Sequence, residues 1–188
     1  MRVRPAMFAD SAAIADIYNQ GIEDRTATFE TRPRTAEDVT GWFDGLHPII
    51  VAEDAGRVIA FAATSTYRPR DCYKGIAEVS VYVARHARRR GAGRVVLQAL
   101  INACEEAGFW KLVSRVFLDN AASRHLIRSL GFREVGVYEK HGQLDGVWRD
   151  VMIVERLIQA NINKSSPDTT ELFEIATEDD CSDAPRCD

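Results

Sequence analysis

The sequence lacks the features that would place the protein in a membrane or direct it out of the cell. No uninterrupted apolar run approaches the roughly 18 residues that suggest a membrane-spanning helix. The first five residues, MRVRP, also lack the apolar stretch of a secretory signal. We therefore expect a cytoplasmic protein with no membrane partner.

Cysteine is scarce as well. The chain has four cysteines, and no two of them have the CxxC spacing. Cys181 and Cys187 resemble a metal-binding or disulfide pair only weakly, because no histidine or second cysteine pair accompanies them. A reduced protein is the better interpretation, and we expect no bound metal.

The chain has little net charge, and that charge is unevenly spread. The formal net charge is −4 over 188 residues; residues 160–188 hold two basic and eight acidic side chains, whereas residues 1–159 hold 22 basic and 20 acidic ones. A nucleic-acid-binding protein needs a broad basic face, so we expect no nucleic-acid partner. The composition predicts one domain over residues 1–159 and an acidic, disordered tail over residues 160–188.

Apolar periodicity predicts a mixed α/β domain. Helices are expected to begin after Asp10, which suits an N-cap, and at a capping box formed by Thr35 and Asp38. Two more helices follow residues 91–93 and residue 120. The expected strands cover residues 3–5, 48–53, 57–62, 76–84, 112–117, 132–139 and 148–157, with the last two joined by a turn through Gly142 and Gly146.

A glycine-containing turn, residues 88–93 (RRRGAG), joins a predicted strand to an amphipathic helix. Its glycines allow close approach of the backbone to a ligand, and the helix that follows presents unpaired amides that suit a pyrophosphate. The alternative is a plain turn with solvated arginines. A Walker loop is excluded because Gly-Lys-Ser/Thr is absent, and Val96 stands where a dinucleotide fingerprint has its third glycine.

The remaining pattern, Arg/Gln-x-x-Gly-x-Gly/Ala after a strand, resembles the GNAT superfamily of N-acetyltransferases, in which this segment binds the pyrophosphate of acetyl-CoA. A second family element follows in residues 120–123 (NAAS) and residues 131–132 (GF). The resemblance spans about residues 2–157. It implies a single α/β domain with a mixed, mostly antiparallel central sheet flanked by helices.

Shorter segments resemble one branch, the phosphinothricin and methionine sulfoximine N-acetyltransferases. They are IYN at residues 17–19, TF at 28–29, RPRT at 32–35, EVSVYV at 78–83 and GVWRDV at 146–151. That branch acetylates the α-amine of glutamate-like amino acids, arsinothricin among them, and commonly forms dimers. The resemblance implies acetyl-CoA as co-substrate, a small amino-acid acceptor, antibiotic resistance and a homodimer.

The resemblance also implies roles for individual residues. Glu78 is the implied catalytic base. The implied cofactor contacts are Val81, Tyr82, Val83, Arg89, Arg90, Gly91, Ala92, Gly93, Arg94, Asn120 and Ser123. The implied substrate contacts are Phe29, Arg68, Arg70 and Tyr73. The aromatic side chain of Trp148 suits a wall of the substrate pocket, together with that of Phe29.

The chemistry of acetyl transfer explains these residue types, but each has a structural alternative. An ammonium cannot attack a thioester, so a carboxylate such as Glu78 is needed to accept its proton; Glu78 equally suits a cross-sheet pair with an arginine. Arg68 and Arg70 offer forked donors for acidic groups, or are exposed loop residues. Asn120 suits an N-cap. Packing would equally account for the aromatic residues.

One position departs from the branch pattern. Ile127 stands where many family members have a tyrosine and the branch has a histidine, and it cannot protonate a leaving thiolate. His125 would point about 200° away on a helix, which leaves Tyr138, His141 or solvent. Two further hypotheses remain open: an acetyltransferase for another small amine or a protein N-terminus, and a non-catalytic acyl-CoA sensor.

Overall fold

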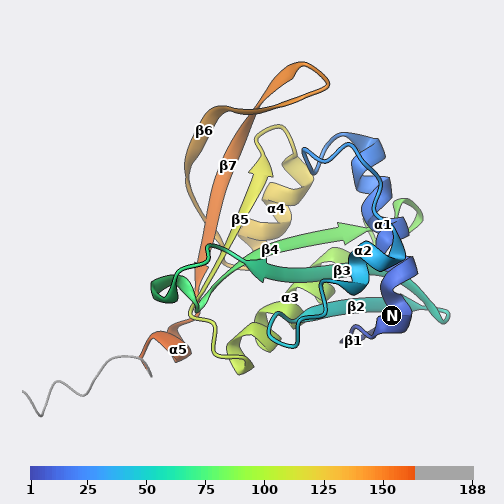
Figure 1. The fold of residues 1–188 in the computed structure, drawn as a ribbon, viewed down its shortest axis with the longest axis horizontal. Helices are drawn as coiled ribbons and strands as arrows, with labels where there is room; N and C mark the ends of the chain where they lie inside the picture. Colours follow the sequence, from blue (N-terminus) through green and yellow to red (C-terminus); the bar gives the residue numbers. More distant parts are fainter. Residues whose placement is uncertain (164–188) are drawn as a thin grey trace, which may run out of the picture.

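A seven-stranded sheet forms the centre of the computed structural model, which describes residues 1–163 (Figure 1). The strand order is β1-β2-β3-β4-β5-β7-β6, and only β4 and β5 are parallel neighbours. This confirms the mixed, mostly antiparallel sheet. The strands are β1 (Arg2–Pro5), β2 (Ile49–Asp54), β3 (Arg57–Thr66), β4 (Ile76–Val83), β5 (Lys111–Phe117), β6 (Arg133–Leu144) and β7 (Val147–Leu157).

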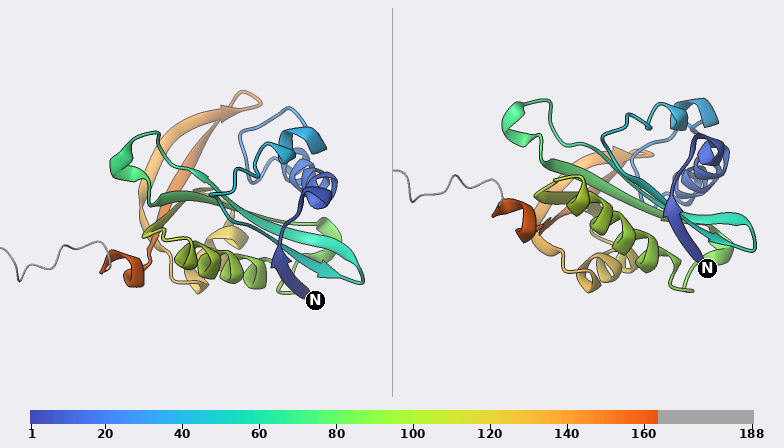
Figure 2. Two further views of the ribbon diagram at one scale, coloured as in Figure 1. Left: turned by 60° about the horizontal axis from the view of Figure 1, so that its bottom comes forward. Right: turned by 90° about the horizontal axis from the view of Figure 1, so that it is seen from below.

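Helices cover both faces of this sheet (Figure 2). The α-helices are α1 (Ser11–Asp24), α2 (Ala36–Thr40), α3 (Ala92–Glu106), α4 (Ala121–Ser129) and α5 (Gln159–Ile162). Figure 2 shows α3 and α4 below the sheet and α1 and α2 above it. The predicted capping box opens α2, where Thr35 accepts from the amide of Asp38 and Asp38 accepts from the amide of Thr35. None of the described helices has the length and apolar character to cross a bilayer.

The two parallel strands separate soon after they meet. Ile76, Ala77 and Glu78 of β4 pair with β5, and one last contact follows, in which the Ser114 hydroxyl donates to the carbonyl of Val79 at 2.8 Å. Beyond this point the two strands diverge in Figure 1, and β3 is the only strand that pairs with β4 in the described chain. Unpaired backbone groups in a sheet bind other partners readily. The divergence therefore prepares one side of β4 for a ligand.

Two local predictions were wrong. Gly142 does not form a turn: it pairs with Arg149 inside β6, and the β6–β7 turn lies at Asp145 and Gly146, whose φ angles are 50° and 79°. Two successive positive φ angles match the twist of a short hairpin. Asp10 precedes α1 as expected, but its carboxylate does not cap that helix; it accepts from the Met7 amide at 2.8 Å.

The last described helix anchors the chain beyond residue 159. In α5, the Asn161 side chain is 4% exposed and donates to the carbonyls of Glu105 and Phe109 at 2.7 and 2.9 Å. These bonds tie α5 to the last turn of α3 and to the segment that leads from α3 into β5. The anchored chain thus extends a few residues past the expected domain boundary. The acidic segment expected to be disordered lies, from residue 164 on, outside the described residues.

A salt-bridge network joins the N-terminal strand to β2 and the start of α1. Arg4 donates to both oxygens of Asp10, at 2.7 and 2.9 Å, and also to Glu53. The hydrogen bonds from Arg4 lower the pKa of the Asp10 carboxyl, although burial opposes them. A carboxyl with a lowered folded-state pKa stabilises the fold above its unfolded pKa, and this stabilisation disappears as the pH falls through the folded value.

We expect Asp10→Asn to lower the free energy of unfolding by about 2 kcal/mol near neutral pH, the typical contribution of hydrogen bonds to a charged group. The difference from wild type should stay constant above about pH 5 and shrink as the pH falls further, because acid then protonates Asp10 in the wild type and removes the same interaction. Urea titration at several pH values measures both effects. Asp16→Asn, at an exposed position of α1, is the control. A difference independent of pH would contradict this account.

Candidate active site

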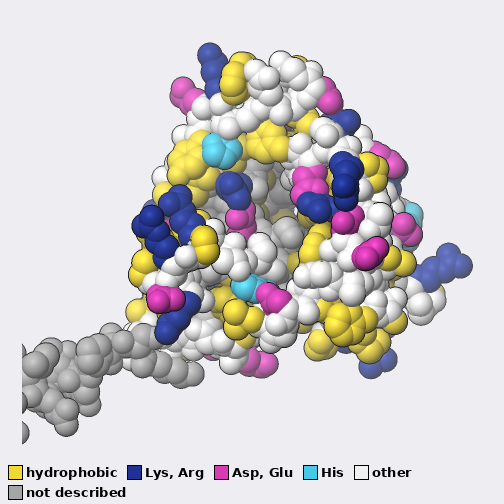
Figure 3. Space-filling view, in the orientation of Figure 1, with side chains coloured by type: hydrophobic (Ala, Val, Ile, Leu, Met, Phe, Trp, Pro, Cys, Tyr) yellow, Lys and Arg dark blue, Asp and Glu magenta, His cyan; other side chains and the backbone are white. Residues whose placement is uncertain are grey.

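A cleft of about 720 Å³ opens where β4 and β5 diverge. It is lined by α1, the segments on both sides of α2, the end of β3, the middle and end of β4, the C-terminal half of β5 and the α4 segment, with one residue each from β6 and β7. The space-filling view shows this hollow at the centre of the face, with charged and apolar side chains around it (Figure 3). A cleft of this size is within the range of small-molecule sites.

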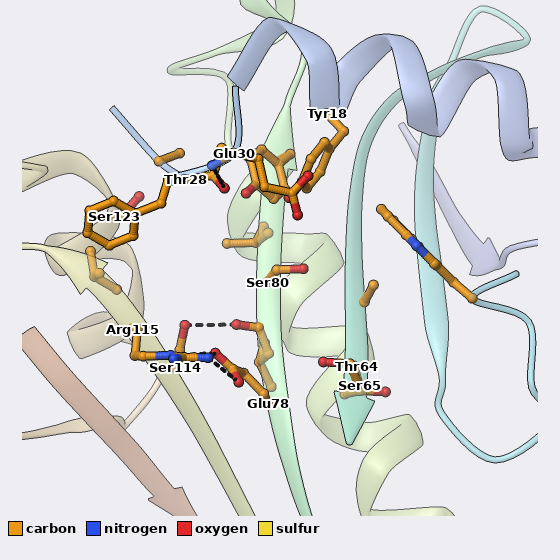
Figure 4. A pocket seen from close by; sticks show the side chains of 18 of the residues that line it. Tyr18, Thr28, Glu30, Thr64, Ser65, Glu78, Ser80, Ser114, Arg115 and Ser123 are labelled. Atoms are coloured by element: carbon orange, nitrogen blue, oxygen red, sulfur yellow. Dashed lines mark hydrogen bonds and ion pairs between the residues drawn. The ribbon is translucent and has the colours of Figure 1, made fainter. Parts of the chain in front are cut away.

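Glu78 and Arg115 form an ion pair in the cleft at the point where the strands part (Figure 4). Arg115 Nε donates to Glu78 Oε1 at 2.8 Å, and Arg115 Nη2 donates to both oxygens at 2.6 and 2.7 Å. The Glu78 side chain is 25% exposed and that of Arg115 is 53% exposed. The structure thus places Glu78 in the cleft and also contains the cross-sheet arginine that the sequence left as an alternative.

Aromatic side chains build the wall of the cleft next to α1. The rings of Tyr18 and Tyr82 lie 4.7 Å apart, and Tyr82 stacks on Phe61 at 5.4 Å. Gly21 makes room for this arrangement, because a Cβ there would lie 2.6 Å from the Tyr82 ring. Burial raises the pKa of Tyr18 and raises that of Tyr82 well above its usual value, so both hydroxyls stay protonated at neutral pH.

A second arginine–glutamate pair lies on the segment between α1 and α2. Arg34 donates through Nε and Nη2 to the two oxygens of Glu30, at 2.7 and 2.6 Å. Asn19 holds this segment to α1, because its side chain donates to the Arg34 carbonyl at 2.9 Å and accepts from the Arg34 amide at 2.8 Å. Glu30 and Arg34 both line the cleft, and the sequence analysis did not identify either as a site residue.

The cleft lining also contains a histidine–aspartate pair that the sequence analysis missed. His47 Nδ1 lies 2.5 Å from Asp44 Oδ2, and the His47 ring is 5.7 Å from that of Phe109. Burial would raise the pKa of Asp44, but hydrogen bonds from His47 and from the amide of Leu46 outweigh it and lower the value to about 2. Asp44 is therefore ionised at neutral pH.

Of the five predicted substrate contacts, the structure brings only Phe29 into the cleft with Glu78. Its ring packs edge-on against Phe117 at 4.7 Å. Arg68, Arg70 and Tyr73 lie on the loop between β3 and β4, outside the cleft lining. Trp148 is 54% exposed near the β6–β7 turn and borders a separate shallow hollow, because the hairpin carries it away from the cleft.

The predicted diphosphate turn has the expected backbone shape. Arg89 and Gly91 have φ angles of 62° and 84°, α3 begins at Ala92, and no described side chain caps the helix. Gly93 lets the turn pack closely, since a Cβ there would lie 3.3 Å from Val83 and 3.2 Å from Leu126. The first amides of α3 therefore remain available to an anion.

The predicted arginines of this turn differ in what they contact. Arg90 pairs with Asp54 at 3.1 Å, and Arg94 donates to the hydroxyl and carbonyl of Ser129 at 2.7 and 3.1 Å. Arg89 is exposed and has no such partner among residues 1–163. Of the three, Arg89 is thus the one whose guanidinium needs to break no contact to reach a ligand.

The remaining predicted cofactor contacts lie around the same opening. Val81 and Tyr82 line the cleft from β4, and Asn120 and Ser123 line it from the start of α4. Asn120 Oδ1 accepts from the Ser123 amide at 3.0 Å, so Asn120 is the N-cap of α4. Its amide nitrogen donates to the carbonyl of Thr26 at 2.8 Å and holds the lining segment in place.

The residues weighed as proton donors also have clear positions. Ile127 is buried and lines the cleft, whereas His125 is exposed and lies outside it. His141 lines the cleft with its ring 6.3 Å from that of Phe29 and 5.1 Å from that of Tyr138, which is not part of the lining. His141 is therefore the candidate that the structure brings to the cleft.

Residues 14–132 match the Acetyltransferase (GNAT) family. The chain belongs to this family. It is 35% identical over 158 residues to the L-methionine sulfoximine/L-methionine sulfone acetyltransferase of Pseudomonas paraeruginosa, with 81% of this chain and 92% of the relative covered.

Solved structures agree with this assignment. A phosphinothricin acetyltransferase of the GNAT superfamily from Sinorhizobium meliloti, in complex with acetyl-CoA, superimposes with a TM-score of 0.78, 30% identity and coverage of 83% and 87%. A ribosomal-protein-alanine N-acetyltransferase from Brucella melitensis superimposes with a TM-score of 0.80, 33% identity and coverage of 84% and 100%. The protein is an acetyl-CoA-dependent N-acetyltransferase of the GNAT family.

The residues present fit acetyl-CoA. The uncapped start of α3 and the glycine turn before it suit a diphosphate, and the open side of β4 leads from that turn into the cleft. Bound there, acetyl-CoA supplies the acetyl group as a thioester.

We expect Gly91→Ala to raise the KM for acetyl-CoA by about tenfold, or about 1.4 kcal/mol. An alanine at a φ of +84° is strained, so the turn should shift and misplace the amides of α3. Gly56→Ala is the matched control, because Gly56 also has a positive φ of +74° and open space around it but lies in the β2–β3 turn. Steady-state kinetics and calorimetric titration measure the effect, and equal KM changes in both variants would contradict it.

Proposed function

We propose that this enzyme transfers an acetyl group from acetyl-CoA to the α-amine of a small glutamate-like amino acid, such as phosphinothricin, arsinothricin or methionine sulfoximine, and so confers resistance to it. The main observation that supports this proposal is the Glu78–Arg115 pair. It places a carboxylate and a guanidinium side by side in the cleft, next to the open side of β4. The names of the relatives support this class of acceptor.

In this proposal Glu78 is the catalytic base. The acceptor enters as an ammonium, its proton passes to a Glu78 oxygen directly or through one water, and the amine then forms the new C–N bond. Overall, an ammonium and a thioester give an amide, a thiol and one proton, so atoms and charge balance. Glu78 suits this task because it lies where the cleft meets β4.

The main chain at residues 81–83 is proposed to stabilise the charge that develops on the acetyl oxygen. Beyond Glu78 this part of β4 pairs with β3 on one side and, among the described residues, with no strand on the other, so amides on the open side are available as donors. The glycine turn, Arg89, Asn120 and Ser123 are proposed to bind the rest of the cofactor. Phe29 is proposed as an apolar wall for the acceptor.

The leaving thiolate needs a different proton donor from the one common in the family. Ile127 cannot donate, and the apolar side chain it presents to the cleft excludes water from its side. We propose that His141 or solvent supplies the proton. His141 lines the cleft close to Phe29, where an acceptor would lie.

A second candidate acceptor is another small amine or a protein N-terminus. One structural neighbour is named a ribosomal-protein-alanine N-acetyltransferase, and the three carboxylates Glu30, Asp44 and Glu78 in the cleft suit an acceptor with positive charge. Thiol release with phosphinothricin, arsinothricin, methionine sulfoximine, alkyl amines and alanine-initiated peptides separates the two proposals. Turnover confined to the amines or peptides would overturn the amino-acid assignment.

We expect Glu78→Gln to lower kcat by about 10²- to 10⁴-fold, the usual contribution of a general base. Its affinity for acetyl-CoA should change little, because the glutamine keeps the size of the side chain and the diphosphate turn lies elsewhere. Glu37→Gln, on the exposed surface of α2, controls for the loss of one carboxylate. Full activity in Glu78→Gln would remove Glu78 from the mechanism.

We also propose a cytoplasmic homodimer that uses the β6–β7 hairpin. The two described cysteines, Cys72 and Cys104, are free thiols, as in reducing compartments. The hairpin exposes large apolar side chains to an extent that suits an interface. They are Val135, Val137, Tyr138, Val147 and Trp148, each between 40% and 57% exposed.

Sedimentation equilibrium tests the dimer. Wild type should sediment at twice the chain mass, and Trp148→Asp should shift the equilibrium toward monomer, because a charge buried in an apolar interface is costly. Met7→Asp, which changes an exposed apolar residue outside the hairpin, should leave the mass unchanged. A monomeric wild type would refute the dimer without affecting the catalytic proposal.

A further inference from the structure

Arg115 is an exposed charged group bonded to the proposed catalytic base. Its pair with Glu78 uses Nε and Nη2, and within residues 1–163 its Nη1 makes no hydrogen bond. A guanidinium is planar and can bind a carboxylate along either of two edges. Glu78 occupies the edge formed by Nε and Nη2, and the edge that carries Nη1 faces away from Glu78. Because the side chain is 53% exposed and lines the cleft, a ligand can reach it.

The cleft offers an anionic acceptor few other cations. Within residues 1–163, two arginines and no lysine line it: Arg34 and Arg115 line the cleft, whereas Arg68 and Arg70 lie outside it. Arg34 is held more tightly: its side chain is 33% exposed, Glu30 occupies Nε and Nη2, and Asn19 fixes its backbone. Arg115 is therefore the guanidinium better able to change its partner.

The two charges of an α-amino acid are spaced to fit the Glu78–Arg115 pair. Its carboxylate and ammonium are attached to the same carbon, so they lie as close together as two touching side chains. An acceptor carboxylate on Arg115 would thus place the ammonium next to Glu78, which Arg115 contacts at 2.6–2.8 Å. The acceptor then replaces one internal ion pair by two new ones.

We propose that Arg115 exchanges partners during catalysis: it pairs with Glu78 in the free enzyme and binds the α-carboxylate of the acceptor in the complex, which releases Glu78 to accept the ammonium proton. The proton moves from the acceptor nitrogen to a Glu78 oxygen, and no electrons are gained or lost. This inference rests on the proposed function. It adds a binding residue and a basis for selecting α-amino acids over simple amines.

The exchange predicts opposite effects on two acceptors. An acceptor without the α-carboxylate cannot displace Glu78, so Arg115 keeps the base engaged and turnover stays low. When Arg115 is replaced by a neutral residue, Glu78 is released for every acceptor, but the carboxylate loses its binding group. A purely structural arginine would instead lower turnover on all acceptors alike.

Steady-state kinetics with L-methionine sulfoximine and its α-carboxamide test this exchange in wild type, Arg115→Met and Arg115→Lys. Arg115→Met should raise the KM for the carboxylate form by about 10- to 100-fold, the usual loss for hydrogen bonds to a charged group. It should leave the KM for the carboxamide nearly unchanged and raise kcat for it. Arg115→Lys keeps the charge but not the forked donors, so its kinetic constants should lie between those of wild type and Arg115→Met.

Arg133→Met is the matched control, because Arg133 also pairs with a glutamate on a neighbouring strand, Glu155, but lies outside the cleft lining. Equal losses for both acceptors in Arg115→Met, or an unchanged preference for the carboxylate, would overturn the exchange while leaving the proposed function in place. Thermal unfolding checks that each variant folds. If Arg115→Met does not fold, the kinetics of Arg115→Lys decide the test. Absence of wild-type turnover on every amino acid would instead refute the proposed function and the exchange together.

Discussion

The separation of β4 from β5 is the constraint on which the site depends. The strands pair over three residues of each and are bridged once more by Ser114 before they part. Were they paired along their whole length, the backbone of β4 would be satisfied on both sides and no cleft would exist. Everything proposed to act on substrate lies at this opening: Glu78 where pairing ends, and the main chain at residues 81–83 beyond it.

Inside the cleft, most charged side chains are paired with one another. Three such pairs line the cleft: Glu78 with Arg115, Glu30 with Arg34, and Asp44 with His47. Pairing offsets part of the cost of holding charges in a partly dry site. In the proposed exchange, an acceptor therefore replaces an existing partner instead of meeting a bare charge. The buried tyrosines next to α1 remain neutral and so provide donors rather than added charge.

The sequence predicted the parts of this protein that local rules determine. Alternation and glycine turns located all seven strands, and the glycine turn before α3 was predicted because glycine before an amphipathic helix has a local signature. The errors came from bonds made between elements. Asp10 was assigned to the helix it precedes, but its carboxylate instead binds Arg4 of β1, six residues earlier in the chain, and the Met7 amide. Gly142 was read as a turn, although pairing with Arg149 makes it part of a strand.

The same limit applies to the site. Motif position brought Glu78 into the prediction, but Arg115 belongs to no motif, and only the register between β4 and β5 places it beside Glu78. One signal for Arg115 was present: it is a charged residue inside a strand, and its two neighbours, Ser114 and Val116, are buried. Arg68, Arg70 and Trp148 were suggested by resemblance and side-chain chemistry, but the β3–β4 loop and the tip of the β6–β7 hairpin hold them outside the cleft lining.

A crystal structure of the enzyme with coenzyme A tests the central claim most directly. The account predicts the diphosphate on the first amides of α3 and the pantetheine arm along the open side of β4, with its sulfur end in the cleft that contains Glu78. A coenzyme bound elsewhere, or β4 and β5 closed together along their length in the complex, would contradict it.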